Sequence, residues 1–302
     1  LTCMSTMLPD RVQRLSEMWL LASTGQDAFG PSPAARWDAA PTGTRVEEPK
    51  RYGSFLHAVE VFDNAAFGLM LPETSSMDPQ QRLLLEAGYE ALHGAALPRA
   101  KLLNSSTAIF VGVMSTEFRE ALPDPNAYAM TGTGHCFAAG RLSYVLGLHG
   151  ACVAIDVACS SALVASHSAC RALQARESTD ALLAGVNMML VPATLDAYAA
   201  AGLTSPSGKA YVFDARANGF IRGEGCAAGV LQAEPAVAQA EVAASIAGSA
   251  VRQDGRSASL TAPNGRAQQL LLDAVLSDAN ATPLQLRLVE AAANGSPMGD
   301  AI

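Results

Sequence analysis

The stretch ACVAIDVACSSALVASHSACRAL, residues 151–173, joins an apolar run to a helical pattern. Residues 151–157 are rich in Ala, Val and Ile and predict a buried strand. Residues 160–174 carry small apolar side chains at helical spacing and predict a helix. A tight turn that contains Cys159 separates the two elements. This order of strand, turn and helix is typical of a βαβ unit.

The same alternation continues on both sides of this stretch and indicates an α/β protein with a buried parallel or mixed sheet. One helix is marked at both ends by its sequence. It has a capping residue in Asp78, a first helical residue in Pro79 and a stop in Gly94. The rest of residues 1–50, apart from one helix, is expected to be loop. The predicted helices are 10–22, 78–92, 138–146, 160–174 and 265–277, and the predicted strands are 107–113, 151–157, 181–190, 225–231, 242–251 and about 286–291.

Composition excludes several classes of protein. The 302 residues are 50% hydrophobic and 16% charged, against about 25% charged in an average soluble domain, so we expect a large buried core. The net charge of -8 disfavours nucleic acid as a partner. No apolar run approaches the length of a membrane span and no signal peptide begins the chain, so a cytoplasmic protein is expected. The six cysteines lack metal-ligand spacing and are expected to be reduced thiols, with no metal bound.

Cys159 is the candidate nucleophile. Ser160 and Ser161 follow it and are suited to cap the helix, which would place the sulfur beside the positive end of the helix dipole. That environment favours the reactive thiolate. A strand-turn-helix elbow also lifts a side chain clear of the sheet, as a nucleophile requires. Spacing alone leaves open a second interpretation, a buried cysteine with a packing role.

The hexapeptide DVACSS, residues 156–161, resembles the active-site elbow of the β-ketoacyl synthases, whose pattern is D-T-A-C-S-S. Other segments resemble landmarks of the same family in the same order, in the style of modular type I polyketide and fatty-acid synthases. These segments are RWD at 36–38 with the helix around Trp19, MDPQQRLLLE at 77–86, AGRLSYVLG at 139–147, FDARANGFIRGEG at 213–225 and QDGRSASLTAPNG at 253–265.

The resemblance implies a thiolase-like, layered αβαβα fold, usually as a homodimer. Residues 1–302 would form one ketosynthase-like domain, mostly the N-terminal half of that fold, with the C-terminal half beginning at about residue 243. Because the chain starts at Leu1 and stops at Ile302, we expect a fragment that is incomplete at both ends and lacks the first strand.

The resemblance also implies the chemistry. Cys159 would accept an acyl group from the phosphopantetheine thiol of an acyl carrier protein, and a malonyl-type extender would then be decarboxylated and joined to it by a Claisen condensation. No cofactor would bind the domain directly. The carrier protein and the other domains of a synthase would be its partners. A thioester suits this task because the acyl-enzyme remains electrophilic.

One departure from the family affects the mechanism. The family uses two histidines downstream of the nucleophile, whereas the five histidines here are 57, 93, 135, 149 and 167. Residues 289–302, VEAAANGSPMGDAI, resemble V-E-A-H-G-T-G-T-P-L-G-D, and Ala292 stands in place of the first histidine. The second would fall beyond Ile302. Losing one oxyanion donor typically costs about 10²–10³ in rate.

Four hypotheses follow. The chain is a condensing ketosynthase, a non-condensing relative that only transfers acyl groups because of Ala292, an inactive dimer scaffold, or, less favoured, a thiolase that uses coenzyme A. The pair His135 and Cys136 is not expected to form a second thiol-imidazole site, because adjacent residues on an extended chain point to opposite faces. Arg216 with Asp214, and Arg222 with Glu224, are expected to form structural ion pairs.

Overall fold

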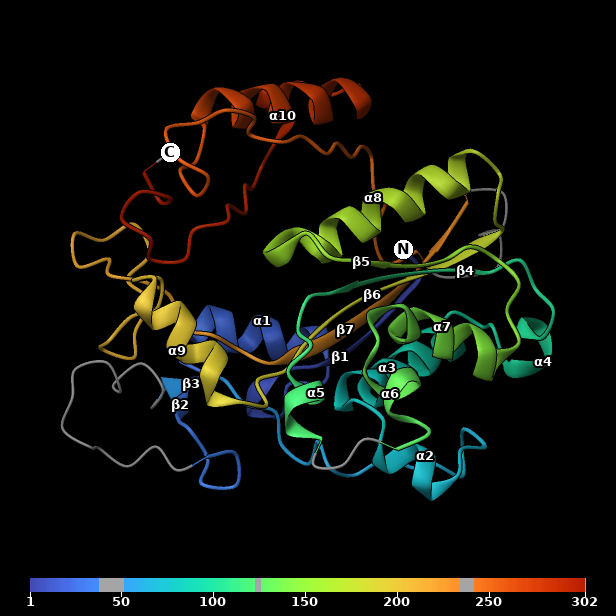
Figure 1. Cartoon of the computed structure of the whole chain (residues 1–302). Helices are drawn as coiled ribbons and strands as arrows, with labels where there is room; N and C mark the ends of the chain where they lie inside the picture. Colours follow the sequence, from blue (N-terminus) through green and yellow to red (C-terminus); the bar gives the residue numbers. More distant parts are fainter. Residues whose placement is uncertain (38–51, 123–125, 234–241, 302) are drawn as a thin grey trace. The chain divides into compact units, whose positions relative to one another are not determined.

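The computed structural model describes residues 1–37, 52–122, 126–233 and 242–301, so Asp38 of the RWD segment lies outside the described residues. The chain, drawn in Figure 1 in colours that follow the sequence, divides into two compact units. The first unit contains Leu1–Phe29, Ser54–Val191 and Gly223–Ser245. The second contains Gly30–Gly53, Pro192–Arg222 and Ile246–Ile302.

A five-stranded mixed sheet lies at the centre of the first unit, as the alternating sequence pattern predicts. The order across the sheet is β1 (Cys3–Met7), β7 (Gly225–Gln232), β6 (Asp180–Asn187), β4 (Ala108–Val113) and β5 (Cys152–Ile155). Strand β4 runs parallel to both of its neighbours, β6 and β5. Strand β7 runs antiparallel to both of its neighbours, β1 and β6.

Helices cover both faces of this sheet (Figure 1). The longest helices of the first unit are α3 (Pro79–Gly94), α7 (His135–Leu146) and α8 (Ser161–Gln174). On β4, Ile109 and Val111 belong to the hydrophobic cluster shared with α3 and α7, whereas Phe110 belongs to the cluster shared with α8. All six residues of β4 are therefore buried. Burial on both faces explains why this strand is a continuous apolar run rather than an alternating one.

The ends of α3 agree with the prediction from its sequence. The Asp78 carboxylate accepts a hydrogen bond from the Gln80 amide at 2.8 Å, and Pro79 occupies the first helical position. The helix ends at Gly94. The helix predicted at 138–146 begins three residues earlier, as α7, because Gly134 acts as its N-cap.

The prediction for the N-terminal region was wrong in two places. Cys3–Met7 forms β1, not loop, because it pairs with β7 more than 200 residues away along the chain. The first helix, α1 (Leu15–Thr24), does not start at Asp10, whose φ is 61°. It starts later because the Glu17 carboxylate accepts hydrogen bonds from the Gln13 and Arg14 amides, at 2.8 and 3.0 Å.

Two strands predicted in the C-terminal region are also wrong. Within the described stretch 242–301, neither 242–251 nor 286–291 is paired with another segment as a strand. An apolar run becomes a strand only when a neighbour pairs with its backbone groups. The helix predicted there is confirmed as α10 (Gly265–Asp278), and the Asn264 side chain caps it by accepting from the Arg266 and Ala267 amides.

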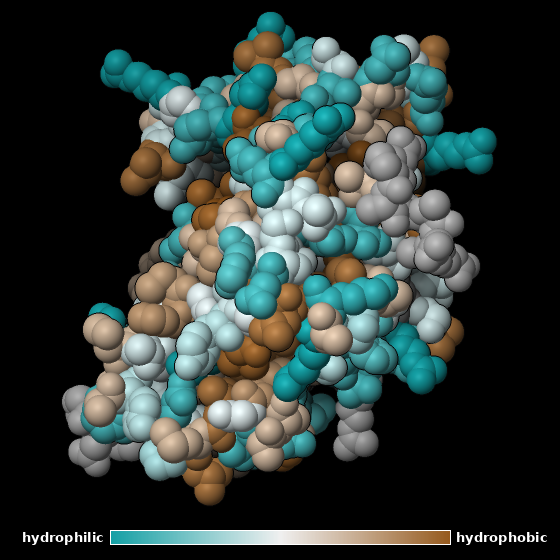
Figure 2. Space-filling model, turned by 90° about the vertical axis from the view of Figure 1, so that its right-hand side faces the viewer, coloured by the Kyte–Doolittle hydropathy of each residue, from teal (hydrophilic) through white to brown (hydrophobic). Residues whose placement is uncertain are grey.

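Shorter elements complete the described residues. They are β2 (Gly30–Pro31), paired with β3 (Tyr52–Gly53), and the helices α2 (Leu71–Ser75), α4 (Arg99–Leu102), α5 (Phe118–Ala121), α6 (Ala129–Thr133) and α9 (Pro192–Ala200). No helix among the described residues is long and apolar enough to cross a membrane. Figure 2 shows apolar and polar residues interspersed over one face of the molecule.

Candidate active site

Cys159 lies in a sharp turn between β5 and α8, where the sequence places it. Strand β5 ends at Ile155, a single 3₁₀ turn spans Ala158–Ser160, and α8 starts at Ser161. The residue before the cysteine, Ala158, has a φ of 54°, in the left-handed region that non-glycine residues rarely occupy. Such a residue costs on the order of 1–3 kcal/mol and persists only where its surroundings hold it. The Cys159 side chain is exposed.

Side-chain hydrogen bonds hold this turn. The Ser161 hydroxyl accepts from the Val157 amide at 2.9 Å and donates to the Ala158 carbonyl oxygen at 2.7 Å. The Ser160 hydroxyl donates to the Val157 carbonyl oxygen at 3.0 Å, and the Asp156 carboxylate accepts from the Ala158 amide at 3.1 Å. The expectation that the serines cap α8 was therefore wrong. Ser160 is the N-cap residue without a side-chain cap bond, because both hydroxyls bind the turn instead.

Two glycines bring the first turn of α8 close to the sheet. Gly112 of β4 and Gly185 of β6 are direct neighbours in the sheet. A Cβ on Gly112 would lie 2.5 Å from the Ala162 amide nitrogen, and a Cβ on Gly185 would lie 2.8 Å from the Ala162 Cβ. Both distances are shorter than a van der Waals contact, so only glycine on both strands permits this approach.

Three loops share the edge of the sheet at which Cys159 lies. Because β4, β5 and β6 run parallel, the segments that follow them leave from the same edge. The Glu117 carboxylate, beyond β4, accepts hydrogen bonds from the Leu190 and Val191 amides beyond β6, at 2.7 and 3.0 Å. Two of the three loops are thereby tied together by a buried carboxylate.

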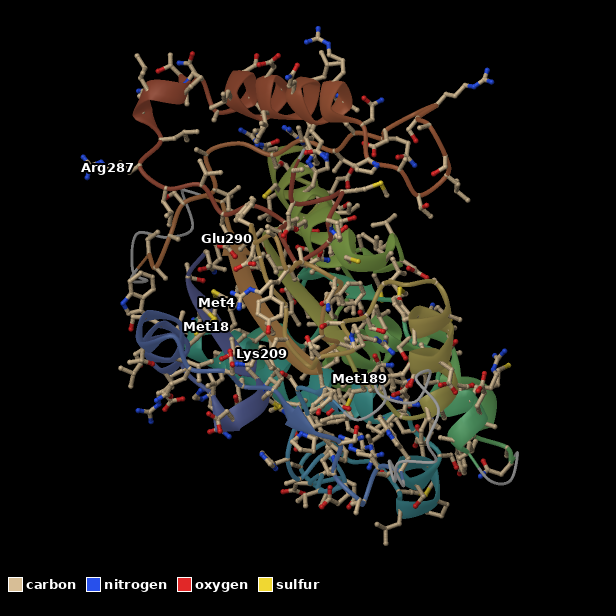
Figure 3. All side chains as sticks on the ribbon, turned by 90° about the vertical axis from the view of Figure 1, so that its left-hand side faces the viewer. Met4, Met18, Met189, Lys209, Arg287 and Glu290 are labelled. Atoms are coloured by element: carbon tan, nitrogen blue, oxygen red, sulfur yellow. The ribbon has the colours of Figure 1, made fainter. Side chains whose placement is uncertain are left out.

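A second buried carboxylate, that of Glu224, holds the same loop beyond β6. It accepts a hydrogen bond from the Met189 amide at 3.0 Å and another from the Leu56 amide at 2.8 Å. Met189 is labelled in Figure 3. Sequence reasoning missed both roles. For Glu224 the sequence suggested only an ion pair with Arg222 and not these amide donors. No local pattern marks Glu117, since its donors come from distant residues.

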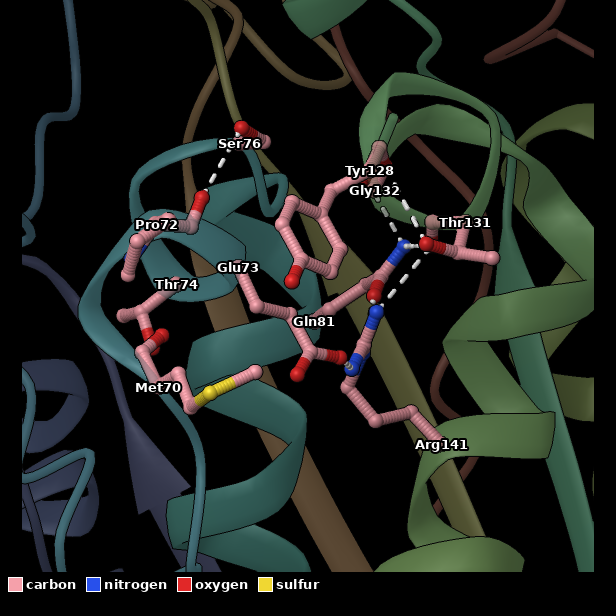
Figure 4. A network of polar contacts seen from close by, with 10 residues as sticks. All are labelled: Met70, Pro72, Glu73, Thr74, Ser76, Gln81, Tyr128, Thr131, Gly132 and Arg141. Atoms are coloured by element: carbon pink, nitrogen blue, oxygen red, sulfur yellow. Dashed lines mark hydrogen bonds and ion pairs between the residues drawn. The ribbon is translucent and has the colours of Figure 1, made fainter. Parts of the chain in front are cut away.

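Arg141 of α7 lies at the centre of a polar network drawn in Figure 4. Its guanidinium donates to Gln81 of α3 at 2.7 Å, pairs with Glu73 of α2 and reaches the Thr131 carbonyl oxygen of α6 at 3.3 Å. Gln81 in turn donates to the Gly132 carbonyl oxygen at 2.9 Å. The network ties four helices together beneath the sheet.

His135 and Cys136 open helix α7, so the extended backbone assumed for them was wrong. His135 Nε2 lies 3.3 Å from the Ser115 carbonyl oxygen, and the Cys136 side chain is exposed. In the second unit, Arg216 pairs with Asp214 at 2.7 Å, as expected. No group of His, Cys, Asp and Glu within the described ranges could hold a metal ion.

The loop that carries Ala292 belongs to the second unit, whereas Cys159 belongs to the first. Glu290, two residues earlier, is labelled in Figure 3. The Asp300 carboxylate holds this loop by accepting from the Gly295 amide at 3.1 Å and the Phe213 amide at 3.0 Å. Ala292 itself is exposed, and its methyl group cannot donate a hydrogen bond.

Family models match most of the chain. The model for the N-terminal domain of the β-ketoacyl synthases matches residues 1–236, and the model for their C-terminal domain matches residues 243–302.

Similar proteins and structures agree with these matches. A phenolphthiocerol/phthiocerol polyketide synthase protein of Mycobacterium tuberculosis is 40% identical over 317 residues, covering 99% of the chain and 14% of that protein. Another protein of the same synthase and species is 41% identical over 305 residues, covering 97% and 20%. A ketosynthase from module 6 of the bacillaene synthase of Bacillus subtilis 168 superposes with a TM-score of 0.90 at 31% identity, covering 99% of this chain and 51% of that one. An oxazolomycin ketosynthase domain from Streptomyces albus JA3453 gives 0.90 at 28% identity, covering 99% and 53%. The chain therefore spans a small part of the curated relatives and about half of the solved ketosynthases.

Proposed function

The chain belongs to the β-ketoacyl synthase family, and from this membership we propose that Cys159 accepts an acyl group and passes it to a malonyl-derived carbanion. The observation that carries the proposal is the exposed thiol of Cys159 on a strained turn between strand and helix. This is the geometry that presents a nucleophile to a large substrate. The relatives named as polyketide synthases favour a ketosynthase of a polyketide synthase.

The first half-reaction is a thioester exchange. The Cys159 thiolate attacks the carbonyl carbon of an acyl thioester on the phosphopantetheine arm of a carrier protein. A new C–S bond forms, the old one breaks, and the departing thiolate takes up a proton. The oxyanion of the tetrahedral intermediate needs hydrogen-bond donors. The amide of Cys159 is suited to this, because Cys159 lies in the short 3₁₀ turn Ala158–Ser160, and the first amides of a helical turn lack an acceptor within it.

The second half-reaction is the condensation. A malonyl thioester loses carbon dioxide, and the electron pair of the broken C–C bond forms an enolate. The enolate carbon attacks the acyl carbonyl carbon on Cys159, the new C–C bond forms, and the Cys159 thiolate leaves.

The carrier protein and the neighbouring domains of the synthase are the partners that this scheme requires, in the cytoplasm. The boundary between the two halves of the domain lies near residue 243.

Intact-mass analysis after incubation with a short acyl thioester tests the first half-reaction. We expect a single acyl adduct that is absent from Cys159→Ala and present in Cys152→Ala. Cys152 is the matched control because it is also exposed and lies at the start of the same strand-turn-helix segment. An adduct that survives Cys159→Ala refutes the assignment. A folded protein with no adduct favours the inactive scaffold.

Ala292 favours a second function, acyl transfer without condensation. An enolate oxygen needs a donor as it forms, and a methyl group offers none. On this hypothesis the wild-type chain forms the acyl adduct on Cys159 but releases little carbon dioxide from a malonyl-carrier thioester.

Ala292→His tests this second function in the polypeptide that carries this sequence. We expect decarboxylation to rise by about 10²-fold, the usual value of one oxyanion donor. Ala291→His is the matched control, because the neighbouring alanine is exposed as well. Rapid decarboxylation by the wild type would contradict the non-condensing function.

A second copy of the chain is the partner we propose for strand β5. It is an outer strand of the sheet that the described residues form, so one row of its backbone groups has no neighbouring strand among them. Its residues Cys152 and Val153 are exposed. Pairing of β5 with a second copy would cover this edge and produce the homodimer that the family resemblance implies.

A further inference from the structure

We propose that Ser161 is a positioning residue, whose hydroxyl holds the turn that presents Cys159. The inference rests on the proposed role of Cys159 as nucleophile and adds a residue on which the direction of that thiol depends. Ser161 would not touch the substrate itself. It would act through the backbone of residues 157 and 158.

The hydrogen bonds of Ser161 lie on both sides of the strained residue. Its hydroxyl accepts from the Val157 amide at 2.9 Å, before Ala158, and donates to the Ala158 carbonyl oxygen at 2.7 Å, after the strained φ of 54°. One oxygen atom thus bridges the Val157 amide, one peptide group before this torsion, and the Ala158 carbonyl oxygen that follows it. Rotation of the Ala158 backbone toward an ordinary conformation would break at least one of the two bonds.

Burial of Ser161 limits the access of water to the position of its hydroxyl. Ser161 is 5% exposed, whereas residues 156 to 160 are all exposed. Gly112 of β4 makes the burial possible, since a Cβ there would lie 2.6 Å from the Ser161 carbonyl carbon. The two hydrogen bonds of Ser161 are partly buried, and removing the hydroxyl leaves the Val157 amide and the Ala158 carbonyl without this partner. A polar group that is left unsatisfied costs up to about 1–3 kcal/mol.

Ser160 provides an internal comparison. It is the adjacent serine, and its hydroxyl donates a single hydrogen bond to the Val157 carbonyl oxygen at 3.0 Å. Its side chain is exposed, so water can take over that bond when the hydroxyl is removed. The two serines therefore differ in burial and in the number of bonds, but not in chemistry.

The turn conformation determines where the Cys159 thiol and amide point, because Ala158 directly precedes them. A displacement of about 1 Å can reduce the rate of an enzyme reaction about 10²-fold. We expect Ser161→Ala to lower the maximal rate constant of Cys159 acylation by about 10- to 100-fold, with little change in the half-saturating thioester concentration. Ser160→Ala should keep the wild-type rate. Ser161→Thr, which retains the hydroxyl, should recover most of it.

The test combines stopped-reaction intact-mass kinetics with hydrogen exchange at the Val157 amide, on variants whose circular dichroism matches the wild type. Faster exchange together with slower acylation in Ser161→Ala, and neither in Ser160→Ala, is the supporting result. Wild-type acylation in Ser161→Ala, equal losses in both alanine variants, or no recovery in Ser161→Thr would overturn the proposal.

The two proposals fail in different ways. An adduct that persists in Cys159→Ala refutes the nucleophile. An adduct confined to Cys159, formed at the wild-type rate in Ser161→Ala, refutes only the positioning role. Hydrogen exchange at Val157 reports the hydrogen bond itself, whichever group is acylated.

Discussion

At the scale of single residues, Asp78 is a buried carboxyl group whose environment opposes its charge. Burial raises the pKa of Asp78 to about 6 from an ordinary value of 3.8, and hydrogen bonds from Gln80 and the charges of Arg82 and His135 oppose part of that rise. The Asp78 carboxylate nevertheless caps α3. The group that starts this helix therefore also makes stability depend on pH.

The predicted pH dependence follows from linkage. Between about pH 4 and pH 6 the folded protein keeps a proton on Asp78 that the unfolded chain has released, so this contribution to stability is present at low pH and is lost as pH rises through that window. A pKa change from 3.8 to about 6 corresponds to roughly 3 kcal/mol.

Asp78→Asn removes the titrating group. The free energy of unfolding, measured with urea at several pH values from about 4 to 6, should then change less steeply with pH than in the wild type. The new amide can donate to Gln80 Oε1, a buried atom with no hydrogen-bond partner in the described part of the chain. Glu120→Gln, at an exposed position, is the control for loss of one carboxylate. An unchanged pH dependence of the free energy of unfolding in Asp78→Asn would contradict the raised pKa of Asp78.

At the scale of elements, the close approach of α8 to β4 and β6 depends on glycines, which have no side chain, at the contact. Gly185→Ala places a Cβ 2.8 Å from that of Ala162. We expect the variant to lose about 1–3 kcal/mol, as overpacked sites do. Adding Ala162→Gly to Gly185→Ala should recover part of the loss, because it removes the atom in conflict. Thermal unfolding measures both effects.

Gly140→Ala is the matched control for this prediction. Gly140 lies inside α7, and a Cβ there meets no atom within 4 Å. Replacing an unstrained helix glycine with alanine usually stabilises by about 0.5–1 kcal/mol. A melting temperature of Gly185→Ala equal to or above that of Gly140→Ala would show that α8 does not need the clearance.

The Arg141 network gives a second prediction for the elements. Arg141→Ala leaves the partly exposed Glu73 and the buried Gln81 without their shared partner, so we expect a loss of about 1–3 kcal/mol, as for a buried polar group left unsatisfied. Arg216→Ala removes an exposed ion pair with Asp214 and should leave the urea midpoint unchanged. Equal effects of the two substitutions would contradict the structural role of the network.

At the scale of the whole molecule, the two outer strands of the sheet allow a test of self-association. Val153 of β5 is 39% exposed and Met4 of β1 is 37% exposed. A lysine on an outer strand disfavours strand pairing between chains. Val153→Lys should therefore lower the association constant of the dimer, measured by sedimentation equilibrium, by at least about tenfold. Met4→Lys should leave that constant unchanged. A loss of association in Met4→Lys alone would place the interface on the other edge.

Much of the α/β pattern could be predicted because its signals are local. Strand β4 carries a continuous apolar run, and α3 carries its own cap, first-turn proline and terminal glycine. The candidate nucleophile could be predicted as well, since the turn at Cys159 lies between a strand and a helix that each have a clear pattern. The proposed role of Ser161 could not, because sequence alone suggests that a serine after such a turn caps the helix.

The sequence by itself determined the class of fold, the family and the position of Cys159, since all three depend on residue types at short spacing. The tertiary structure alone decided that Cys3–Met7 forms a strand and that 242–251 does not, because a strand exists only through hydrogen bonds to a partner distant in sequence. It also decided that Glu117 holds the loop at Leu190, 73 residues away. The donors to a buried carboxylate are set by which amides lie near it in the folded protein. The spacing of residues along the sequence therefore does not indicate them.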